Sequence, residues 1–278
     1  MMSDIGEVRP QALLLAFFGG HVLGRGVSVS TGSVLEALAR TGVAEPTARS
    51  ALGRMADHGL LRRHRRGRKV YFGLTPRSRA ILDDGEVRIW RVGVVNDHWD
   101  GRWTLLGFTV PESRRRERHL LRSRLLWAGF GGLQGGLWIA PSPVDVNALL
   151  QDIEAAERVK VFEARALAPT DVDELVDAAW DIEGLAKTHR RFLERWSRPP
   201  LEAGAGDALA AQMLLTAEWL QVLRRDPRLP VRHLPADWPA ARAQRRFRLL
   251  HAELDPGARA IAAGLLDTVP DEDADPAA

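Results

Sequence analysis

The residues of this chain best suited to bind a polyanion lie in one short stretch, LLRRHRRGRKVYFGLT, residues 60–75. Six of the eight residues from Arg62 to Lys69 are arginine or lysine, and apolar residues flank the run on both sides. Such side chains bind phosphates because each phosphate that they neutralise releases condensed counterions. The repulsion among so many like charges would be relieved on DNA. The run therefore indicates a DNA-binding surface, and a surface hairpin with solvated arginines is the alternative.

The segment before this run has the pattern of a helix with one apolar and one polar face. We predict a helix from Glu45 to His58, since an acid and a proline suit its first turn and a glycine follows its end. Ala48, Leu52 and Met55 recur on one face. The other face could read base edges in the major groove, while the basic run reaches phosphates or the adjacent minor groove. The predicted DNA-binding residues are Thr47, Arg49, Ser50, Arg54, Arg62, His64, Arg65, Arg66, Arg68 and Lys69.

These residues need a scaffold, and the first third of the chain predicts one. An apolar helix runs from Pro10 to about Leu23, and a loop over residues 24–30 leads into a short helix over residues 33–41. After the Glu45 helix, two strand-like pieces surround Gly67, and a further helix begins at residues 75–76. The order of two helices, a short turn, a helix and a hairpin is that of a winged helix-turn-helix.

Charge is spread unevenly along the chain. The 278 residues have a formal net charge of +3, but residues 1–80 hold 13 Lys and Arg against 5 Asp and Glu. A basic N-terminal third on a near-neutral remainder indicates a local polyanion-binding module. The alternative is a solvated charged surface.

Composition excludes several classes of protein. Hydrophobic residues make up 45% and charged residues 27%, which is typical of a soluble globular protein. Cysteine is absent, which excludes disulfides, thiolate nucleophiles and Cys-ligated zinc. No apolar run reaches the ~18 residues of a membrane span, and the start MMSDIGEVRP lacks a signal-peptide pattern. We therefore expect a cytoplasmic protein that does not contact membranes.

The middle of the chain alternates strand and helix patterns. Strands are predicted over residues 103–110, 137–140 and 159–164, with helices over 113–129 and 143–150 between them, which predicts a small α+β sandwich. The glycine-rich segment GFGGLQGG, residues 129–136, follows a helix and has glutamine where a dinucleotide fingerprint needs glycine. We interpret it as a helix end followed by a flexible turn.

The rest of the chain is helical in pattern. We expect one long segment over residues 171–196, with a break near Gly184, and helices over about 207–225 and 239–254. The fold class is thus α+β. The predicted domains are a winged helix-turn-helix over residues 1–86, a central domain over 87–168, a helical C-terminal domain over 169–267, and an acidic disordered tail over 268–278.

Other chemistry is less specific. Asp97 and Asp100 could hold Mg²⁺ for a nuclease, and the acids at residues 171–174 could pair for acid/base work or simply begin a helix. The eight histidines form no HExxH pattern. An apolar ligand pocket could be lined by some of the tryptophans. The candidates are Trp99, Trp103, Trp138, Trp180, Trp219 and Trp238.

Four stretches resemble the PaaX-like family, repressors of phenylacetic acid degradation genes. TARSALGRMADHGLLRRHRRGRKVYFGLT is similar to the family's recognition helix and wing. WDGRWTLLGF and GFGGLQGGLWIAP are similar to its central domain. LVDAAWDIEGLA and LLTAEWLQVLRRDPRLPVRHLPADWP are similar to its C-terminal part. The likeness covers about residues 10–255, and the order of the segments is more specific than the wing alone.

The resemblance implies a homodimeric transcriptional repressor of a catabolic operon, bound to a double-stranded DNA operator. It also implies a ferredoxin-like central domain, similar to the CRISPR adaptation endonuclease, and a helical C-terminal domain. An aryl-CoA thioester is the effector that the family suggests, and a small acidic aromatic metabolite would serve as well. A DNA-binding scaffold without an effector and a metal-dependent nuclease are the other function classes.

Overall fold

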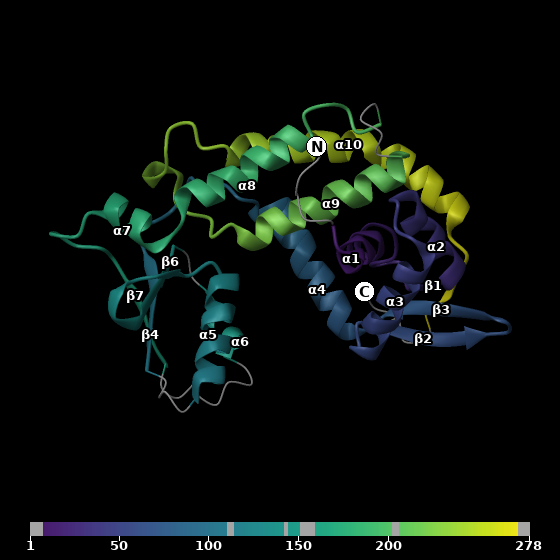
Figure 1. Cartoon of the computed structure of the whole chain (residues 1–278), viewed down its shortest axis with the longest axis horizontal. Coiled ribbons are helices and arrows are strands. Elements are labelled where there is room, and N and C mark those ends of the chain that lie inside the picture. Colours follow the sequence, from purple (N-terminus) through teal and green to yellow (C-terminus); the bar gives the residue numbers. More distant parts are fainter. Residues whose placement is uncertain (1–7, 110–113, 142–143, 151–158, 202–205, 272–278) are drawn as a thin grey trace. The chain divides into compact units, whose positions relative to one another are not determined.

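The protein has an α+β fold with two four-stranded antiparallel sheets, shown in Figure 1. The computed structural model describes residues 8–109, 114–141, 144–150, 159–201 and 206–271. The chain divides into two compact units. The first comprises Met1–Gly93, Arg191–Gln221 and Gln244–Ala278, and the second comprises Val94–Arg190 and Val222–Ala243. Within the described ranges, no helix is both long enough and apolar enough to cross a membrane.

The first unit contains the expected winged helix-turn-helix, which is formed by its N-terminal elements. The sheet order is β2-β3-β1-β8, so the hairpin lies at one edge and a strand from the C-terminal region lies at the other. In chain order the elements are α1 (Pro10–His21), β1 (Val27–Ser30), α2 (Thr31–Arg40), α3 (Glu45–Asp57), β2 (Leu61–Arg66), β3 (Lys69–Leu74), α4 (Pro76–Glu86), the π-helix η1 (Val87–Val92) and β8 (Thr268–Pro270). The unit also takes parts of α8 (Ile182–Arg195), α9 (Ala208–Arg225) and α10 (Ala240–Leu265).

Local sequence explains the limits of these helices. The Ser30 side chain caps α2 by accepting a hydrogen bond from the Ser33 backbone N–H at 3.3 Å. Thr75 and Ser78 form a reciprocal capping box at the start of α4. Gly67 has φ +62°, a left-handed conformation that favours glycine and that allows the tight turn between β2 and β3. These short-range signals are the reason that the winged helix was predictable.

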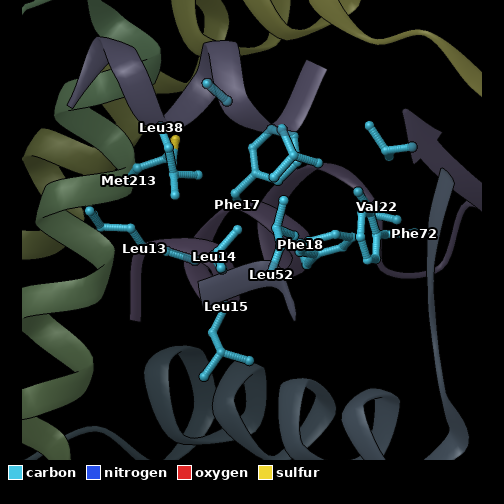
Figure 2. Close-up of a cluster of buried hydrophobic side chains, with 14 of the residues drawn as sticks. Leu13, Leu14, Leu15, Phe17, Phe18, Val22, Leu38, Leu52, Phe72 and Met213 are labelled. Atoms are coloured by element: carbon cyan, nitrogen blue, oxygen red, sulfur yellow. The ribbon is translucent and has the colours of Figure 1, made fainter. Parts of the chain in front are cut away.

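Helix α1 supplies the centre of the core of the first unit. Leu13, Leu14, Phe17 and Phe18 are each at most 1% exposed, and burying such a side chain stabilises a protein by about 1.5–3 kcal/mol. Figure 2 shows Leu38, Leu52, Phe72 and Met213 in the same cluster. Because Met213 lies on α9, a helix of the C-terminal region shares one core with the winged helix.

His21 at the end of α1 is a buried group that titrates. It is 2% exposed, and burial, reinforced by the charge of Arg25, lowers the pKa of His21 from 6.5 to about 4. The native state therefore holds a neutral imidazole, and the unfolded state binds the proton more strongly. We expect the free energy of unfolding to fall as the pH declines from 6.5 towards 4. Urea titrations across this range should show a flatter pH dependence in His21→Leu, whereas the control His98→Gln, at an exposed histidine, should behave like the wild type.

The second unit contains a ferredoxin-like domain. Its sheet order is β5-β6-β4-β7 and all neighbours are antiparallel, which is the arrangement of a β-α-β-β-α-β unit. In chain order the elements are β4 (Trp103–Phe108), α5 (Arg115–Trp127), β5 (Gly131–Gly132), the 3₁₀ helix η3 (Gln134–Gly136), β6 (Leu137–Ala140), α6 (Val146–Leu150), β7 (Val159–Ala164), α7 (Val172–Ala179) and the 3₁₀ helix η5 (Val231–His233). The expected α+β fold class and ferredoxin-like centre are confirmed.

Two expected irregular segments are strands. Residues 24–30 were predicted as a loop, but Val27–Ser30 forms β1, which pairs with β3. Residues 268–278 were predicted as a disordered tail, but Thr268–Pro270 forms β8, which pairs with β1; residues 272–278 lie outside the described residues. The predictions were wrong at these two strands, because such short strands form through pairing with distant segments, which local composition does not encode.

Three further boundaries differ from the expectation. Gly131–Gly132 is a short strand rather than part of a turn, because it pairs with β6. The break between α7 and α8 lies at Trp180–Asp181 rather than at Gly184, because the Asp181 side chain accepts a hydrogen bond from the Gly184 N–H at the start of α8. Helix α10 continues through Pro256 to Leu265 rather than ending near residue 254, and its residues Ala258 and Ala262 pack into the core.

Candidate nucleic-acid interface

Helix α3 has the two faces that the sequence predicts. Ala48, Leu52 and Met55 are at most 2% exposed and pack in the core. The four residues predicted to contact DNA from this helix are all solvent-exposed: Thr47, Arg49, Ser50 and Arg54. The polar face thus carries two guanidinium and two hydroxyl groups, which are groups that bind base edges and phosphates.

Two of these arginines are oriented by short-range contacts along the helix. Arg49 donates from Nε to Glu45 Oε1 at 2.8 Å, and Arg54 donates to the Ser50 hydroxyl. Both members of the Arg49–Glu45 pair are more than half exposed, and exposed pairs of this kind are worth about 0.3–0.5 kcal/mol. Such a weak pair leaves the Arg49 guanidinium available to a ligand.

The basic run folds as the predicted hairpin. Arg66 pairs with Lys69 across the turn, and the ladder continues to the pair of Leu61 and Leu74. Figure 1 shows the hairpin of β2 and β3 extending beyond the helices of its own unit. The tip carries Arg65, Arg66 and Arg68, which are exposed and face no acidic partner among the described residues. Within the described part of the chain, Arg65 Nε donates only to the Gly67 carbonyl of the same turn, at 3.1 Å, so a projecting tip with exposed guanidinium groups is suited to bind phosphates.

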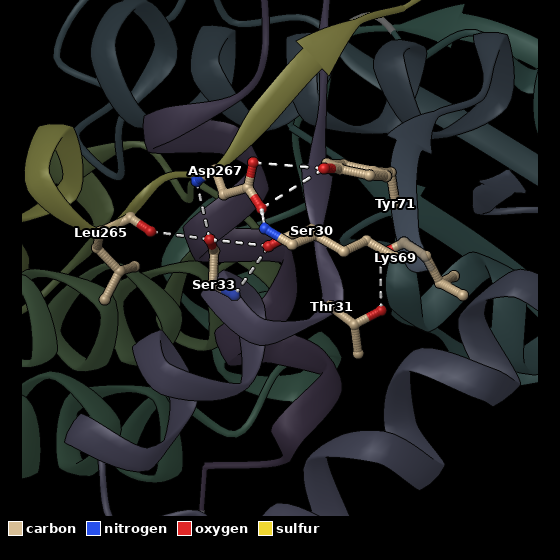
Figure 3. A network of polar contacts seen from close by, with 8 residues as sticks. Ser30, Thr31, Ser33, Lys69, Tyr71, Leu265 and Asp267 are labelled. Atoms are coloured by element: carbon tan, nitrogen blue, oxygen red, sulfur yellow. Dashed lines mark hydrogen bonds and ion pairs between the residues drawn. The ribbon is translucent and has the colours of Figure 1, made fainter. Parts of the chain in front are cut away.

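Strand β3 of the hairpin is joined to the C-terminal segment by polar contacts, shown in Figure 3. Lys69 Nζ lies 2.8 Å from Asp267 Oδ2, and the Tyr71 hydroxyl donates to the same carboxylate at 3.4 Å. The Lys69 ammonium lowers the pKa of Asp267, and the carboxylate raises the pKa of Lys69. Ser33 completes the network, since its hydroxyl donates to the Leu265 carbonyl at 2.8 Å and accepts from the Asp267 N–H at 2.9 Å.

A second carboxylate of this segment is buried. The Asp271 side chain is 2% exposed and forms ion pairs with Arg62 and Arg79. Its backbone N–H donates to the Gly26 carbonyl at 2.8 Å. Arg62 therefore has a partner inside the protein and differs from the arginines at the tip. Sequence reasoning missed Asp271 and Arg79, and only the wing residues of this network were predicted as functional.

His64 also has a neighbour within the hairpin. Its ring stacks on Tyr71 with centroids 5.9 Å apart, and the side chain is only partly exposed. The ten predicted DNA-binding residues thus lie on one helix and one hairpin of the same compact unit. The structure separates them into exposed groups on α3 and at the turn of the hairpin, and groups along the two strands, Arg62, His64 and Lys69, that contact other residues of the protein.

The acids proposed for a nuclease site have other partners. Asp100 Oδ2 lies 3.3 Å from Arg102 Nε, and Asp97 Oδ1 lies 3.7 Å from His98 Nε2. In the part of the chain that the structure describes, no three His, Asp or Glu side chains are grouped as metal ligands would be. Asp171 caps α7 by accepting from two backbone N–H groups, so it begins a helix. The arrangement does not favour the nuclease alternative.

Three of the six tryptophans considered for a pocket are buried, and Trp99, Trp180 and Trp238 are partly exposed. Trp103 and Trp219 are at most 2% exposed, and Trp138 is 6% exposed. Trp180 packs against Trp103 with ring centroids 6.1 Å apart. Trp99 differs, because it is partly exposed and has an arginine over its ring.

Comparisons with known proteins agree with this architecture. Three family models match the chain: PaaX-like protein over residues 9–78, PaaX protein central Cas2-like domain over 96–176, and PaaX-like protein C-terminal domain over 180–264. The transcriptional repressor PaaX of Escherichia coli strain K12 is 28% identical over 264 residues, which cover 90% of this chain and 82% of that protein. A solved structure of an uncharacterized protein from Mycobacterium tuberculosis is similar with a TM-score of 0.63 and 26% identity, covering 91% of this chain and 99% of that one.

Proposed function

The chain belongs to the PaaX-like family, and from this premise we propose that it is a cytoplasmic DNA-binding transcriptional regulator that represses a catabolic operon. The observation that carries the proposal is the exposed polar face of α3 together with the exposed arginines of the hairpin tip in the same unit. Three residues separate the end of α3 from the start of β2, so the helix and the hairpin keep a fixed orientation. One groove of a duplex can then receive α3 while the tip reaches the neighbouring backbone.

The individual residues take different roles in this proposal. Arg49 and Arg54, with Thr47 and Ser50, would contact bases or orient α3 in the major groove. Arg65, Arg66 and Arg68 would contact phosphates or the minor groove, with His64 and Lys69 beside them. Arg62 would hold the base of the hairpin through Asp271 and so act as a positioning residue.

The regulator would bind a palindromic operator as a homodimer. Two-fold symmetry would place the half-sites one helical turn or a multiple apart. A small effector such as an aryl-CoA thioester would release the protein from DNA by binding preferentially to the conformation with the lower operator affinity. What supports this part is family membership.

Selection of bound fragments from a genomic DNA pool tests the function directly. The purified protein should retain a small set of fragments that share an inverted repeat, and their neighbouring genes would identify the operon. Retention of random fragments with no shared sequence would contradict a specific regulator. A single, non-repeated site would contradict the homodimer.

Arg49→Ala tests the base-reading role of α3. Loss of a guanidinium that binds a guanine edge is expected to weaken operator binding by about 1–3 kcal/mol and to relax specificity at one base position. Titrations with the operator and with single-base variants measure both effects. Arg88→Ala is a matched control, because Arg88 also forms an exposed pair with an acid four residues before it, Asp84. Equal effects of the two substitutions would contradict the role of Arg49.

Asp267→Asn tests whether the C-terminal carboxylate restrains the charge of the hairpin. The change leaves the backbone contact with Ser33 in place but frees Lys69, so DNA affinity should rise. If Lys69 then neutralises a phosphate, the slope of log affinity against log salt should steepen by about 0.9. Glu36→Gln, which removes the same charge beside Arg40, should not change the slope. An unchanged slope in both variants would show that Lys69 does not reach DNA.

A further inference from the structure

Two arginines of the second unit converge on one point. Arg165 Nη1 lies 3.2 Å, and Arg232 Nη2 3.8 Å, from the position that a side-chain Cβ would occupy on Gly101. Gly101 has φ +84°, a conformation that favours glycine, and a side chain there would crowd the Arg165 guanidinium. Arg165 follows β7 and Arg232 lies in η5, so the chain brings them together from segments far apart in sequence. Two guanidinium groups that approach the same point repel each other, and an anion bound beside both would relieve this repulsion.

Neither arginine has an acidic partner within the described residues, although acids are near. Each of these acids contacts a residue other than Arg165 and Arg232. Asp100 and Glu163 pair with Arg102, and Asp173 lies 2.7 Å from His233. The three carboxylates balance the charges of Arg102, Arg165 and Arg232, but among the described residues none of them pairs directly with Arg165 or Arg232, and Arg232 Nε donates instead to His233 Nε2 at 3.2 Å. A bound anion would give Arg165 and Arg232 a negatively charged group in direct contact.

The surrounding structure holds the site in place. Arg232 lies over the Trp99 ring, 4.5 Å from its centroid, and the Trp99 indole N–H donates to the Arg102 carbonyl at 2.7 Å. Trp99 in turn packs against Trp103 with ring centroids 4.6 Å apart. The segment of η5 is tied by the hydrogen bond from the Val231 N–H to the Asn96 carbonyl at 3.1 Å. Arg232 is thus pre-organised, which lowers the entropy lost when it binds a ligand.

We propose that Arg165 and Arg232 form a binding site for the phosphate group of a small molecule. Guanidinium forks match the oxygens of a phosphate, and two of them match its charge of about −1.5 to −2 at neutral pH. A carboxylate has a single charge and would leave one arginine unpaired. Under the proposed function, this ligand would be the effector. Its role as effector rests on the proposed function, whereas the binding of phosphate by the two arginines does not.

Calorimetric titration of the full chain with inorganic pyrophosphate, at constant ionic strength and without DNA, tests the site. Saturable binding is expected below about 10 mM. Arg165→Gln and Arg232→Gln should each weaken binding about tenfold or more, since each removes a charged hydrogen bond. The matched control is Arg190→Gln, which removes the same charge from an exposed pair with Glu183 in the same unit and should not change binding. The Trp99 indole resonance should shift on titration, because Arg232 lies on that ring.

Several outcomes would overturn the proposal. These are the absence of saturable binding, equal weakening in all three variants, and binding of benzoate but not of pyrophosphate. The two arginines could instead hold the phosphates of DNA. Arg165→Gln and Arg232→Gln should therefore leave DNA affinity unchanged, and a loss of DNA affinity with intact pyrophosphate binding would also overturn it. Because DNA binding is measured separately, failure of this site and failure of the proposed function are distinguishable.

Discussion

Replacing Asp271 by alanine is expected to lower the free energy of unfolding by about 3 kcal/mol. The Asp271 carboxylate is 2% exposed and pairs with Arg62 and Arg79, so its loss removes one buried ion pair from each of two arginines. Removing one member of a buried ion pair costs about 3–5 kcal/mol, and the lower end applies because both arginines keep partial access to water. Urea denaturation followed by far-ultraviolet circular dichroism measures the effect.

A matched substitution separates this effect from the loss of an ordinary ion pair. Glu163→Ala removes a carboxylate that pairs with Arg102, but both side chains are about half exposed, so the expected loss is below about 1 kcal/mol. Asp271→Asn keeps the size of the side chain and should lie between the wild type and the alanine variant. Similar small losses for Asp271→Ala and Glu163→Ala would show that the C-terminal carboxylate does not stabilise the hairpin.

The winged helix was predictable because its signals are local. The two faces of α3 follow from helical periodicity over residues 45–58, and the hairpin follows from a glycine between two strand-like pieces. Strands β1 and β8 carry no comparable signal. β1 has the sequence VSVS and β8 the sequence TVP, and each becomes a strand because it pairs with a segment far away in the chain.

The candidate site shows the same limit. The sequence identifies the basic residues but not which of them are free. Arg62 and Lys69 look equivalent to their neighbours, yet their partners Asp271 and Asp267 lie 209 and 198 residues further along the chain. The charge pattern therefore assigned both residues to DNA, whereas the fold engages them with these carboxylates. The matched C-terminal family segment ends at residue 264, before either aspartate.

The contacts of the C-terminal segment have a consequence for regulation. Helix α10 leads directly into β8, and the aspartates on either side of β8, Asp267 and Asp271, pair with Lys69 and Arg62 of the hairpin. A shift of α10 relative to the sheet would therefore break or strengthen contacts of Lys69 and Arg62. This gives the proposed regulator a physical connection between its helical region and its DNA-binding surface. The tip arginines are not part of that connection, so substitutions at the tip test DNA contact independently of it.

Alanine at Arg65, Arg66 and Arg68 together is expected to weaken DNA binding on the order of 100-fold near physiological salt. Each phosphate contact contributes about 0.9 to the slope of log affinity against log salt, so the loss of three should reduce the slope by about 2.7. The effect should be nearly the same for operator and unrelated duplexes, since phosphates carry no sequence information. Fluorescence anisotropy titrations at several salt concentrations measure both quantities.

A second triple variant decides whether local contact or total charge is responsible. Alanine at Arg115, Arg116 and Arg242 removes the same charge from exposed positions on α5 and α10. Charges that do not touch DNA act over roughly a Debye length, about 8 Å at physiological ionic strength, so this variant should keep the wild-type slope. Equal losses in the two triple variants would mean that the protein attracts DNA through its overall charge. Loss confined to the first variant would mean that the tip of the hairpin touches the phosphates, because a slope changes only where counterions are displaced.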